Sequence, residues 1–141
     1  MTIKSVKAII IKNKKYLLQF RDNKKNIFFP NYWGLFGGRL NKDEKNSIGI
    51  LREIKEELNL EVKIKKEIMT LDYVMIGYTK KRKLTYYENY TKDFSKLTLF
   101  EGKRFKFFTF KELKGLKIIP MDYVAINAHY NYTYNSRIKS R

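Results

Sequence analysis

The sequence contains no cysteine, only two prolines and a single histidine among its 141 residues. Without cysteine the chain forms no disulfide bond and offers no thiolate ligand to zinc, which fits a reducing compartment such as the cytoplasm. The apolar run Ala8-Ile9-Ile10-Ile11 is far too short for a membrane span or for the core of a signal peptide. We therefore expect a cytoplasmic protein with no membrane partner.

Acidic residues are also scarce, because 14 Asp and Glu face 31 Lys and Arg, which gives a net charge of +17. Such a surface attracts polyanions, so nucleotides and RNA are both candidate partners. Six of the 14 acids fall between residues 43 and 61, which predicts an acidic site inside a basic molecule, with phosphates steered toward it: Asp43, Glu44, Glu53, Glu56, Glu57 and Glu61. The alternative is that abundant Lys, Asn, Ile and Tyr reflect genome base composition.

The length of the chain corresponds to one ordinary domain, and no stretch rich in Pro, Gly or Ser divides it. We expect a single domain over residues 1–130, followed by a basic tail over 131–141 that is disordered, since chain ends usually fray. The oligomeric state is expected to be a monomer or a homodimer.

Three carboxylates between residues 53 and 57 carry the strongest functional signal. At about 100° per residue, Glu53, Glu56 and Glu57 fall within roughly one third of a helix circumference. Like charges at this spacing repel, so something must compensate them. Flanking Arg52 and Lys55 are candidates, and hard divalent cations such as Mg²⁺ or Mn²⁺ suit all-oxygen ligands better. The alternative reading is a solvated acidic face.

The residues around these acids favour a built site. Gly37 and Gly38 allow close backbone approach and lead into a polar loop over 39–46, before a helix expected over 47–58. The helix also has apolar residues on another side, which predicts a core face: Ile48, Ile50, Leu51, Ile54 and Leu58.

This segment resembles the Nudix box, which runs Gly, five residues, Glu, seven residues, Arg-Glu, apolar, any, Glu-Glu, any, Gly, apolar. The matching positions are Gly38, Glu44, Arg52, Glu53, Ile54, Glu56, Glu57 and Leu60. Only Asn59 departs, where the family usually has glycine at the end of the helix. Asn tolerates the left-handed C-cap conformation, so we expect the helix to end there.

The resemblance extends from about residue 3 to residue 128. Residues 32–38 are similar to the aromatic strand and glycine pair before the box, with Phe36 in place of the usual proline, and residues 97–102, 105–110 and 111–113 are similar to the late strand pair and short helix. The resemblance implies an α/β fold, the Nudix-type α/β/α sandwich with a mixed β-sheet, a catalytic helix after a loop and a C-terminal helix.

A coarse reading of the chain agrees with this order. We expect a hairpin of strands 5–12 and 15–20 around Asn13-Lys14, a polar loop over 22–30, and strands over 62–78 and 84–90 separated by the basic turn 80–83. Further strands are expected over 97–100 and 105–110, and a last helix over 121–130 after Pro120.

The family resemblance assigns roles within the box. Glu53 and Glu57 are expected to ligate Mg²⁺, Glu56 to bind a second ion or to activate water, and the carbonyl of Gly38, or of Gly37, to complete the site. Arg52 is expected to hold Glu44 or Glu53 by a charge-assisted hydrogen bond, unless Glu44 is simply a solvated loop acid.

Other assignments come from outside the helix. Glu101 is a candidate metal ligand or base, although Glu-Gly is also a good turn. Arg21 is expected to contact phosphate or base, or else to be solvated at a strand end. Trp33, with Phe28, Phe29 and Tyr32, would stack a nucleobase or else belong to the core, and Gly37 and Arg39 are further substrate-binding candidates. His129 is assigned no catalytic role.

The expected activity is Mg²⁺-dependent hydrolysis of a phosphoanhydride in a nucleoside diphosphate-linked substrate, first of all conversion of a nucleoside triphosphate to a monophosphate and pyrophosphate, as in MutT-like enzymes. Alternatives within the class are hydrolysis of nucleotide sugars or ADP-ribose, of dinucleoside polyphosphates, and removal of the 5′ pyrophosphate or cap from RNA. A non-catalytic nucleotide or RNA sensor is the alternative from another class.

Overall fold

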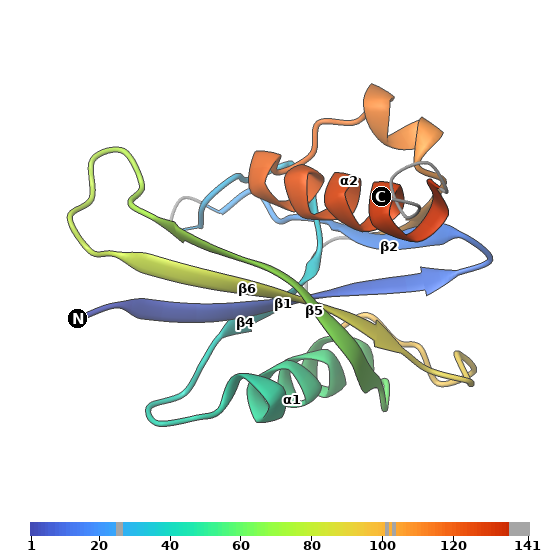
Figure 1. Cartoon of the computed structure of the whole chain (residues 1–141), viewed down its shortest axis with the longest axis horizontal. Helices are drawn as coiled ribbons and strands as arrows, with labels where there is room; N and C mark the ends of the chain where they lie inside the picture. The colour runs from blue at the N-terminus through green and yellow to red at the C-terminus, as the bar shows by residue number, and fades with distance from the viewer. Residues whose placement is uncertain (25–26, 101, 103, 136–141) are drawn as a thin grey trace. The chain divides into compact units, whose positions relative to one another are not determined.

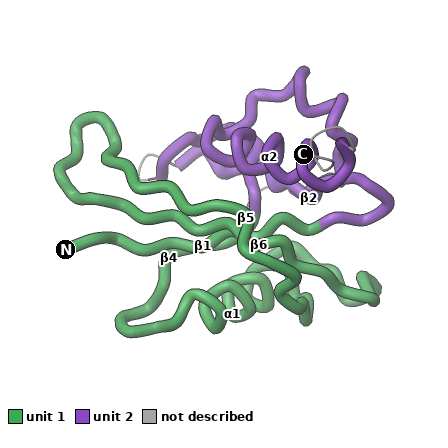
Figure 2. The backbone as a smooth tube through the Cα atoms, viewed as in Figure 1, with its two compact units in different colours: residues 1–10, 36–101 green, residues 11–35, 102–141 purple. Residues whose placement is uncertain are grey.

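The structure is a computed structural model that describes residues 1–24, 27–100, 102 and 104–135. The chain divides into two compact units (Figure 2): unit 1 comprises residues 1–10 and 36–101, and unit 2 comprises residues 11–35 and 102–141. The box lies entirely in unit 1. None of the described helices is long and apolar enough to cross a membrane.

Unit 1 contains a mixed sheet with one helix (Figure 1). Strand β1 (Ile3–Lys12) pairs antiparallel with β4 (Phe36–Arg39) on one side and parallel with β6 (Arg82–Tyr90) on the other, and β6 pairs antiparallel with β5 (Lys63–Tyr73). Helix α1 (Asn46–Leu58) follows β4 after a short loop. Its apolar residues join those of the strands in a core made of Val6, Ala8, Ile9, Ile10, Phe36, Ile50, Ile54, Leu58, Leu60, Leu84 and Tyr86.

Unit 2 is built around β2 (Lys15–Phe20). This strand pairs antiparallel with β7 (Arg104–Phe108), with the short β3 (Trp33–Gly34) and with the end of β1. A 3₁₀ helix, η1 (Lys111–Gly115), leads to helix α2 (Pro120–Tyr134), which has proline at its first position, where a missing N–H is harmless. The core of unit 2 comprises Tyr16, Leu17, Leu18, Trp33, Leu35, Phe108, Leu113, Ile119, Ala125 and Ile126.

The expected α/β class, with a mixed β-sheet, a helix after a loop and a C-terminal helix, is confirmed. The expected hairpin is confirmed as well, because Asn13 and Lys14 have φ of 52° and 61° between paired strands. Positive φ at both central residues is what a two-residue type I′ turn requires.

The expected strand over residues 97–100 is wrong. The alternating pattern of this segment favours a strand, but its amides bond to a helix instead: Thr98 N–H donates to the Leu58 carbonyl at 3.0 Å and Phe100 N–H to the Glu57 carbonyl at 2.8 Å. The last carbonyls of a helix have no partner within it. The segment therefore satisfies the C-terminal end of α1 rather than extending a sheet.

Two other boundaries differ from expectation. Strand β5 ends at Tyr73 rather than continuing to residue 78, because a turn follows in which Tyr78 N–H donates to the Met75 carbonyl at 2.9 Å. Helix α2 continues to Tyr134, so the first four residues of the expected tail are helical, while residues 136–141 lie outside the described part of the chain. The expected boundary between the domain and the tail at residue 130 remains a prediction.

Candidate metal and phosphate site

Helix α1 begins and ends within one residue of the prediction. It starts at Asn46, and Asn59 ends it in the left-handed conformation, with φ 56° and ψ 31° and with its N–H donating to the Lys55 carbonyl at 3.0 Å. The prediction that Asn59 replaces the usual glycine as the C-cap is confirmed. The helix is held at its end by local geometry that non-glycine residues other than Asn seldom adopt.

The core face of α1 is narrower than expected. Ile50, Ile54 and Leu58 are buried, whereas Ile48 and Leu51 are 57% and 36% exposed. At about 100° per residue, Ile48 lies roughly 160° around the helix from Ile50, so the two residues cannot face the same sheet. The prediction that Ile48 and Leu51 belong to the core is therefore wrong.

The three glutamates of α1 lie at graded depths. Glu57 is 2% exposed, while the side chains of Glu53 and Glu56 are 14% and 58% exposed. This order follows the helical angle, because Glu57 is nearest to the buried stripe and Glu56 is furthest from it. The alternative of a solvated acidic face does not hold for Glu57 and Glu53. The three carboxylates therefore extend from the core at Glu57, through Glu53, to the surface at Glu56.

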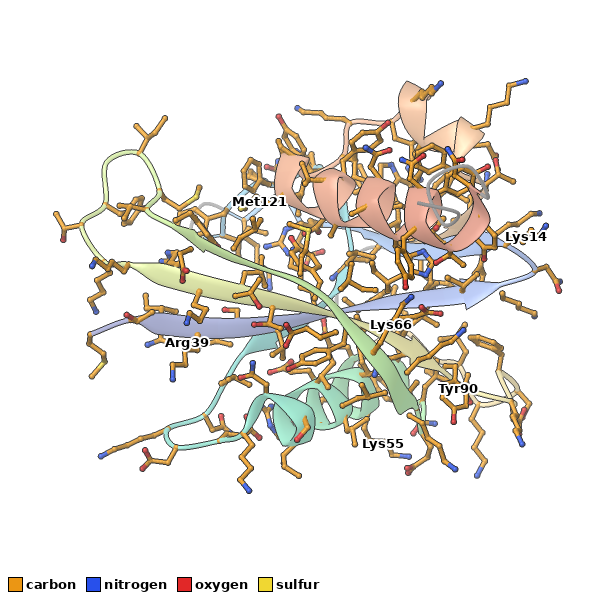
Figure 3. The ribbon with its side chains drawn as sticks, in the orientation of Figure 1. Lys14, Arg39, Lys55, Lys66, Tyr90 and Met121 are labelled. Carbon is orange, nitrogen blue, oxygen red and sulfur yellow. The ribbon has the colours of Figure 1, made fainter. Side chains whose placement is uncertain are left out.

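Strand β4 brings bare backbone against the two inner carboxylates. The Gly37 N–H donates to Glu57 Oε1 at 2.9 Å. A Cβ added to Gly38 would lie 2.6 Å from Glu53 Cδ and Oε2, closer than real contacts allow. The absence of a side chain at Gly38 therefore makes the room that the Glu53 carboxylate occupies. Figure 3 labels Arg39 on this strand and Lys55 in the last turn of α1.

Arg52 connects the acids through four short contacts. Its Nε and Nη2 donate to the two oxygens of Glu44 at 2.7 and 2.8 Å, and its Nη1 donates to Glu53 Oε1 at 3.0 Å and to Glu56 Oε2 at 3.1 Å. The Glu44 pair has the planar two-bond geometry that guanidinium and carboxylate favour. Lys55, the other expected counter-charge, pairs instead with Glu61 at 3.2 Å.

The ion pair between Arg52 and Glu44 shifts the pKa values of both groups. The hydrogen bonds from Arg52, and then the one from the Asn41 N–H, lower the pKa of Glu44 from 4.5 to about 2. The same bond to Glu44 is the main cause that raises the pKa of Arg52 above its usual value. Glu44 is thus a permanent carboxylate at neutral pH, and its two bonds hold the guanidinium at the start of α1.

The donor set suits a hard divalent cation, since every candidate ligand is a carboxylate or carbonyl oxygen. The lack of a side chain at Gly38 lets the Glu53 carboxylate lie directly against the backbone of β4. In the described part of the chain, however, no three acid or histidine side chains are gathered closely enough to hold a metal as they stand. Nη1 of Arg52 donates to both a Glu53 oxygen and a Glu56 oxygen, so these two acids are paired with the guanidinium.

The family model described as the NUDIX domain matches residues 1–124. The chain belongs to the Nudix family. It is a Nudix hydrolase, and enzymes of this family act on nucleotide-derived substrates and generally use divalent metal ions. Comparison with curated proteins gave no match.

Solved structures support the Nudix fold at low sequence identity. The MutT protein from Methanosarcina mazei Go1 has a TM-score of 0.76 and 20% identity, with 94% of this chain and 96% of that chain covered. A C. elegans Ap4A hydrolase has a TM-score of 0.72 and 18% identity, covering 94% and 98%. The E. coli dihydroneopterin triphosphate pyrophosphohydrolase has a TM-score of 0.72 and 15% identity, covering 94% and 95%. Their likeness concerns the fold.

The other predicted site residues of this Nudix chain have varied surroundings. In unit 1, Arg39 is exposed and its carbonyl accepts a 3.4 Å bond from Arg52. In unit 2, Arg21 donates from Nε to the Phe28 carbonyl at 3.2 Å. Trp33 is 9% exposed and packs edge-on against Phe108, with ring centroids 4.8 Å apart, as its core alternative describes. Glu101 lies outside the described residues.

Gly49 is a site residue that the sequence reasoning missed. A Cβ there would lie 2.2 Å from Leu40 Cδ2 and 3.0 Å from Glu44 Oε1, so its absence lets the loop before α1 pack against the helix. The signal was present, because glycine inside a helical pattern weakens the helix by about 1 kcal/mol relative to alanine and usually marks a packing constraint.

Proposed function

We propose that this Nudix hydrolase converts nucleoside triphosphates and water to nucleoside monophosphates and pyrophosphate, with Mg²⁺ as the cation. The observation that supports it best is the arrangement around Arg52: one guanidinium holds Glu44 with two bonds and reaches Glu53 and Glu56 with a third nitrogen. Two bonds to Glu44 fix the guanidinium, and Glu53 is the acid that a bound cation would share with it.

Mg²⁺ would be held by Glu53 and Glu57, with the carbonyl of Gly38 as a further oxygen ligand. When bound, it would neutralise phosphate oxygens and lower the pKa of a water molecule. The cation would share the Glu53 carboxylate with Arg52 Nη1, while Nε and Nη2 keep the guanidinium on Glu44. Arg52 therefore remains in place and orients Glu53 from the side.

We assign proton transfer to Glu56. It is the most exposed of the three acids, with its side chain 58% exposed, and it stands one turn from Glu53. Water attacks phosphorus, the bridging P–O bond breaks, Glu56 accepts the proton, and pyrophosphate leaves. The alternative role for Glu56 is to bind a second ion. A general base and a metal ligand are distinguished by pH dependence, because only the former imposes its own pKa on the rate at saturating metal.

The test is a substrate panel with Mg²⁺ in which the products are resolved by chromatography. The panel contains the eight common nucleoside and deoxynucleoside triphosphates, ADP-ribose, nucleotide sugars, dinucleoside polyphosphates and 5′-triphosphorylated RNA. We expect monophosphate and pyrophosphate from at least one triphosphate. Faster turnover of a dinucleoside polyphosphate, a nucleotide sugar or the RNA end would transfer the assignment to that class.

A paired substitution tests the site itself. Glu57→Gln is expected to lower turnover by at least about 100-fold, because even groups that merely support metal ligands often contribute 10- to 100-fold. Glu67→Gln, which changes an exposed acid on β5, is the matched control and should keep full activity. Unchanged turnover in a folded Glu57→Gln protein would refute the role assigned to Glu57, whereas no turnover of any substrate in the panel by the parent protein would favour the sensor alternative.

A further inference from the structure

The loop between β5 and β6 exposes apolar side chains at its tip. Val74 is 50%, Ile76 99% and Tyr78 56% exposed. A β-turn from Met75 to Tyr78 produces this, with Gly77 at φ 85° in the third position, the positive value that a type II turn requires. The turn places Ile76 at its outer corner, where no part of unit 1 covers it. Figure 1 shows the loop as a yellow-green arc projecting beyond both strands.

A basic hollow lies at the base of the same loop. Its volume is ≈ 490 Å³ and its lining comprises Thr2, Lys4, Asp72, Tyr73, Val74, Lys81 and Lys83. Pairing explains why these charges meet, since Lys4 on β1 is opposite Lys83 on β6, which is opposite Asp72 on β5. Three lysines face one carboxylate. We call residues 74–83 the tip loop.

One kind of partner can bind both the exposed apolar residues of the tip loop and the lysines of the basic hollow at its base. Nucleic acid would use the lysines but would leave Val74 and Ile76 in water. A second copy of the chain would place a lysine run against a like-charged surface on a protein of net charge +17. An anionic bilayer offers phosphate groups to the lysines at the base of the loop and an apolar interior to Ile76 at its outer corner.

We propose that the tip loop docks unit 1 on an anionic lipid surface. Ile76 enters the boundary between headgroups and acyl chains, Val74 and Tyr78 lie at the headgroup level, and Lys4, Lys81 and Lys83 bind headgroup phosphates. The contact is peripheral and reversible, and it is independent of the hydrolytic site. It revises the expectation that the protein has no membrane partner.

Co-sedimentation with vesicles tests the proposal. Vesicles of phosphatidylcholine alone are compared with vesicles containing 30 mol% phosphatidylglycerol, and we expect binding only to the latter, weakening with salt. Ile76→Ser should weaken binding about tenfold, from the apolar area lost. Lys81→Gln with Lys83→Gln should weaken it about 30-fold, at about 1 kcal/mol per lysine.

Matched controls separate the loop from general charge and hydrophobicity. Val124→Ser changes an apolar residue of α2 that is 52% exposed, and Lys111→Gln with Lys114→Gln removes two exposed lysines of η1. Both should bind vesicles like the parent protein. Equal losses in loop and control variants would overturn the proposal, as would equal binding to both vesicle types.

An Ile76→Trp variant reports insertion directly. We expect its emission to shift to shorter wavelength on addition of the anionic vesicles, and to stay unchanged with single-stranded RNA. Loss of RNA binding in the double lysine variant, without any vesicle binding by the parent, would assign the basic hollow to nucleic acid and would refute lipid docking. Unchanged melting temperatures establish that the variants are folded.

Discussion

Replacing Gly38 by alanine should damage the candidate metal site without unfolding the protein. A Cβ at this position would lie 2.6 Å from the Glu53 carboxyl carbon, whereas ordinary contact begins at 3.4 Å, so the carboxylate must retreat by the difference, about 0.8 Å. The obstacle is the end of a flexible side chain, which can move at small energetic expense. On its other side Glu53 Oε1 is bonded to Arg52 at 3.0 Å, so the movement disturbs that contact as well.

The expected result is a stable protein with a damaged site. Misplacement by about 1 Å can lower a rate about 100-fold, and we expect a loss of this order in Gly38→Ala. Metal affinity should fall in parallel, and Mn²⁺ binding followed by electron paramagnetic resonance measures it without a substrate. Urea unfolding should show a decrease of less than about 1 kcal/mol, within the range typical of substitutions that avoid the core.

Gly115→Ala is the matched control, because a Cβ at Gly115 meets nothing within 4 Å. It should leave both Mn²⁺ affinity and turnover at the parent level. The reasoning fails if Gly38→Ala keeps parental Mn²⁺ affinity, since Glu53 would then not be a ligand displaced by the new side chain. It also fails if the variant unfolds, because the contact would then support the fold rather than the site.

Four other outcomes follow from the same geometry. Arg52→Lys should lower turnover about 10- to 100-fold at saturating Mg²⁺, because one ammonium cannot reproduce the fork. Glu44 has a lowered pKa, so its contribution to stability is complete above pH 4.5 and is lost as the pH falls through about 2; unfolding curves of the parent and Glu44→Gln should converge over that interval. Asn59→Ala should destabilise the protein by about 1 kcal/mol in urea, and Asn59→Gly should not, since only alanine is strained in the left-handed region. Asn89 is 1% exposed, and its side-chain amide has no hydrogen-bond partner within the described structure. Asn89→Leu should therefore raise the free energy of unfolding by about 1 kcal/mol in calorimetry.

Local rules in the sequence predicted what depends on local geometry. Asn13-Lys14 signalled a two-residue turn and Asn59 a left-handed cap, and both have the positive φ that those assignments require. The spacing of the glutamates likewise predicted one shared side of α1. Each of these properties is set by a few neighbouring residues, so sequence alone contains them.

Properties set by the rest of the fold were beyond that reasoning. Helical periodicity gives the angles between residues but not which side meets the sheet, so Ile48 and Leu51 were assigned to the core although they are exposed. Residues 97–100 have the pattern of a strand, yet the carbonyls at the end of α1 compete for their amides. The depth of Glu57 depends on the position of β4, which lies 20 residues earlier at the Gly37 amide.

The clustered acids have one counter-charge in the structure, Arg52, and a second in the proposed cation. The sequence argument named a divalent cation as the better counter-charge, but in the structure Arg52 already supplies one to Glu53 and Glu56. The charges of Glu53 and Glu56 on helix α1 are therefore compensated by Arg52 without a metal. In the proposed site a cation would share Glu53 with one guanidinium nitrogen, so its affinity would reflect the difference between two ionic arrangements. Glu44 would hold the guanidinium in both arrangements, because its two bonds go to Nε and Nη2 and not to Nη1.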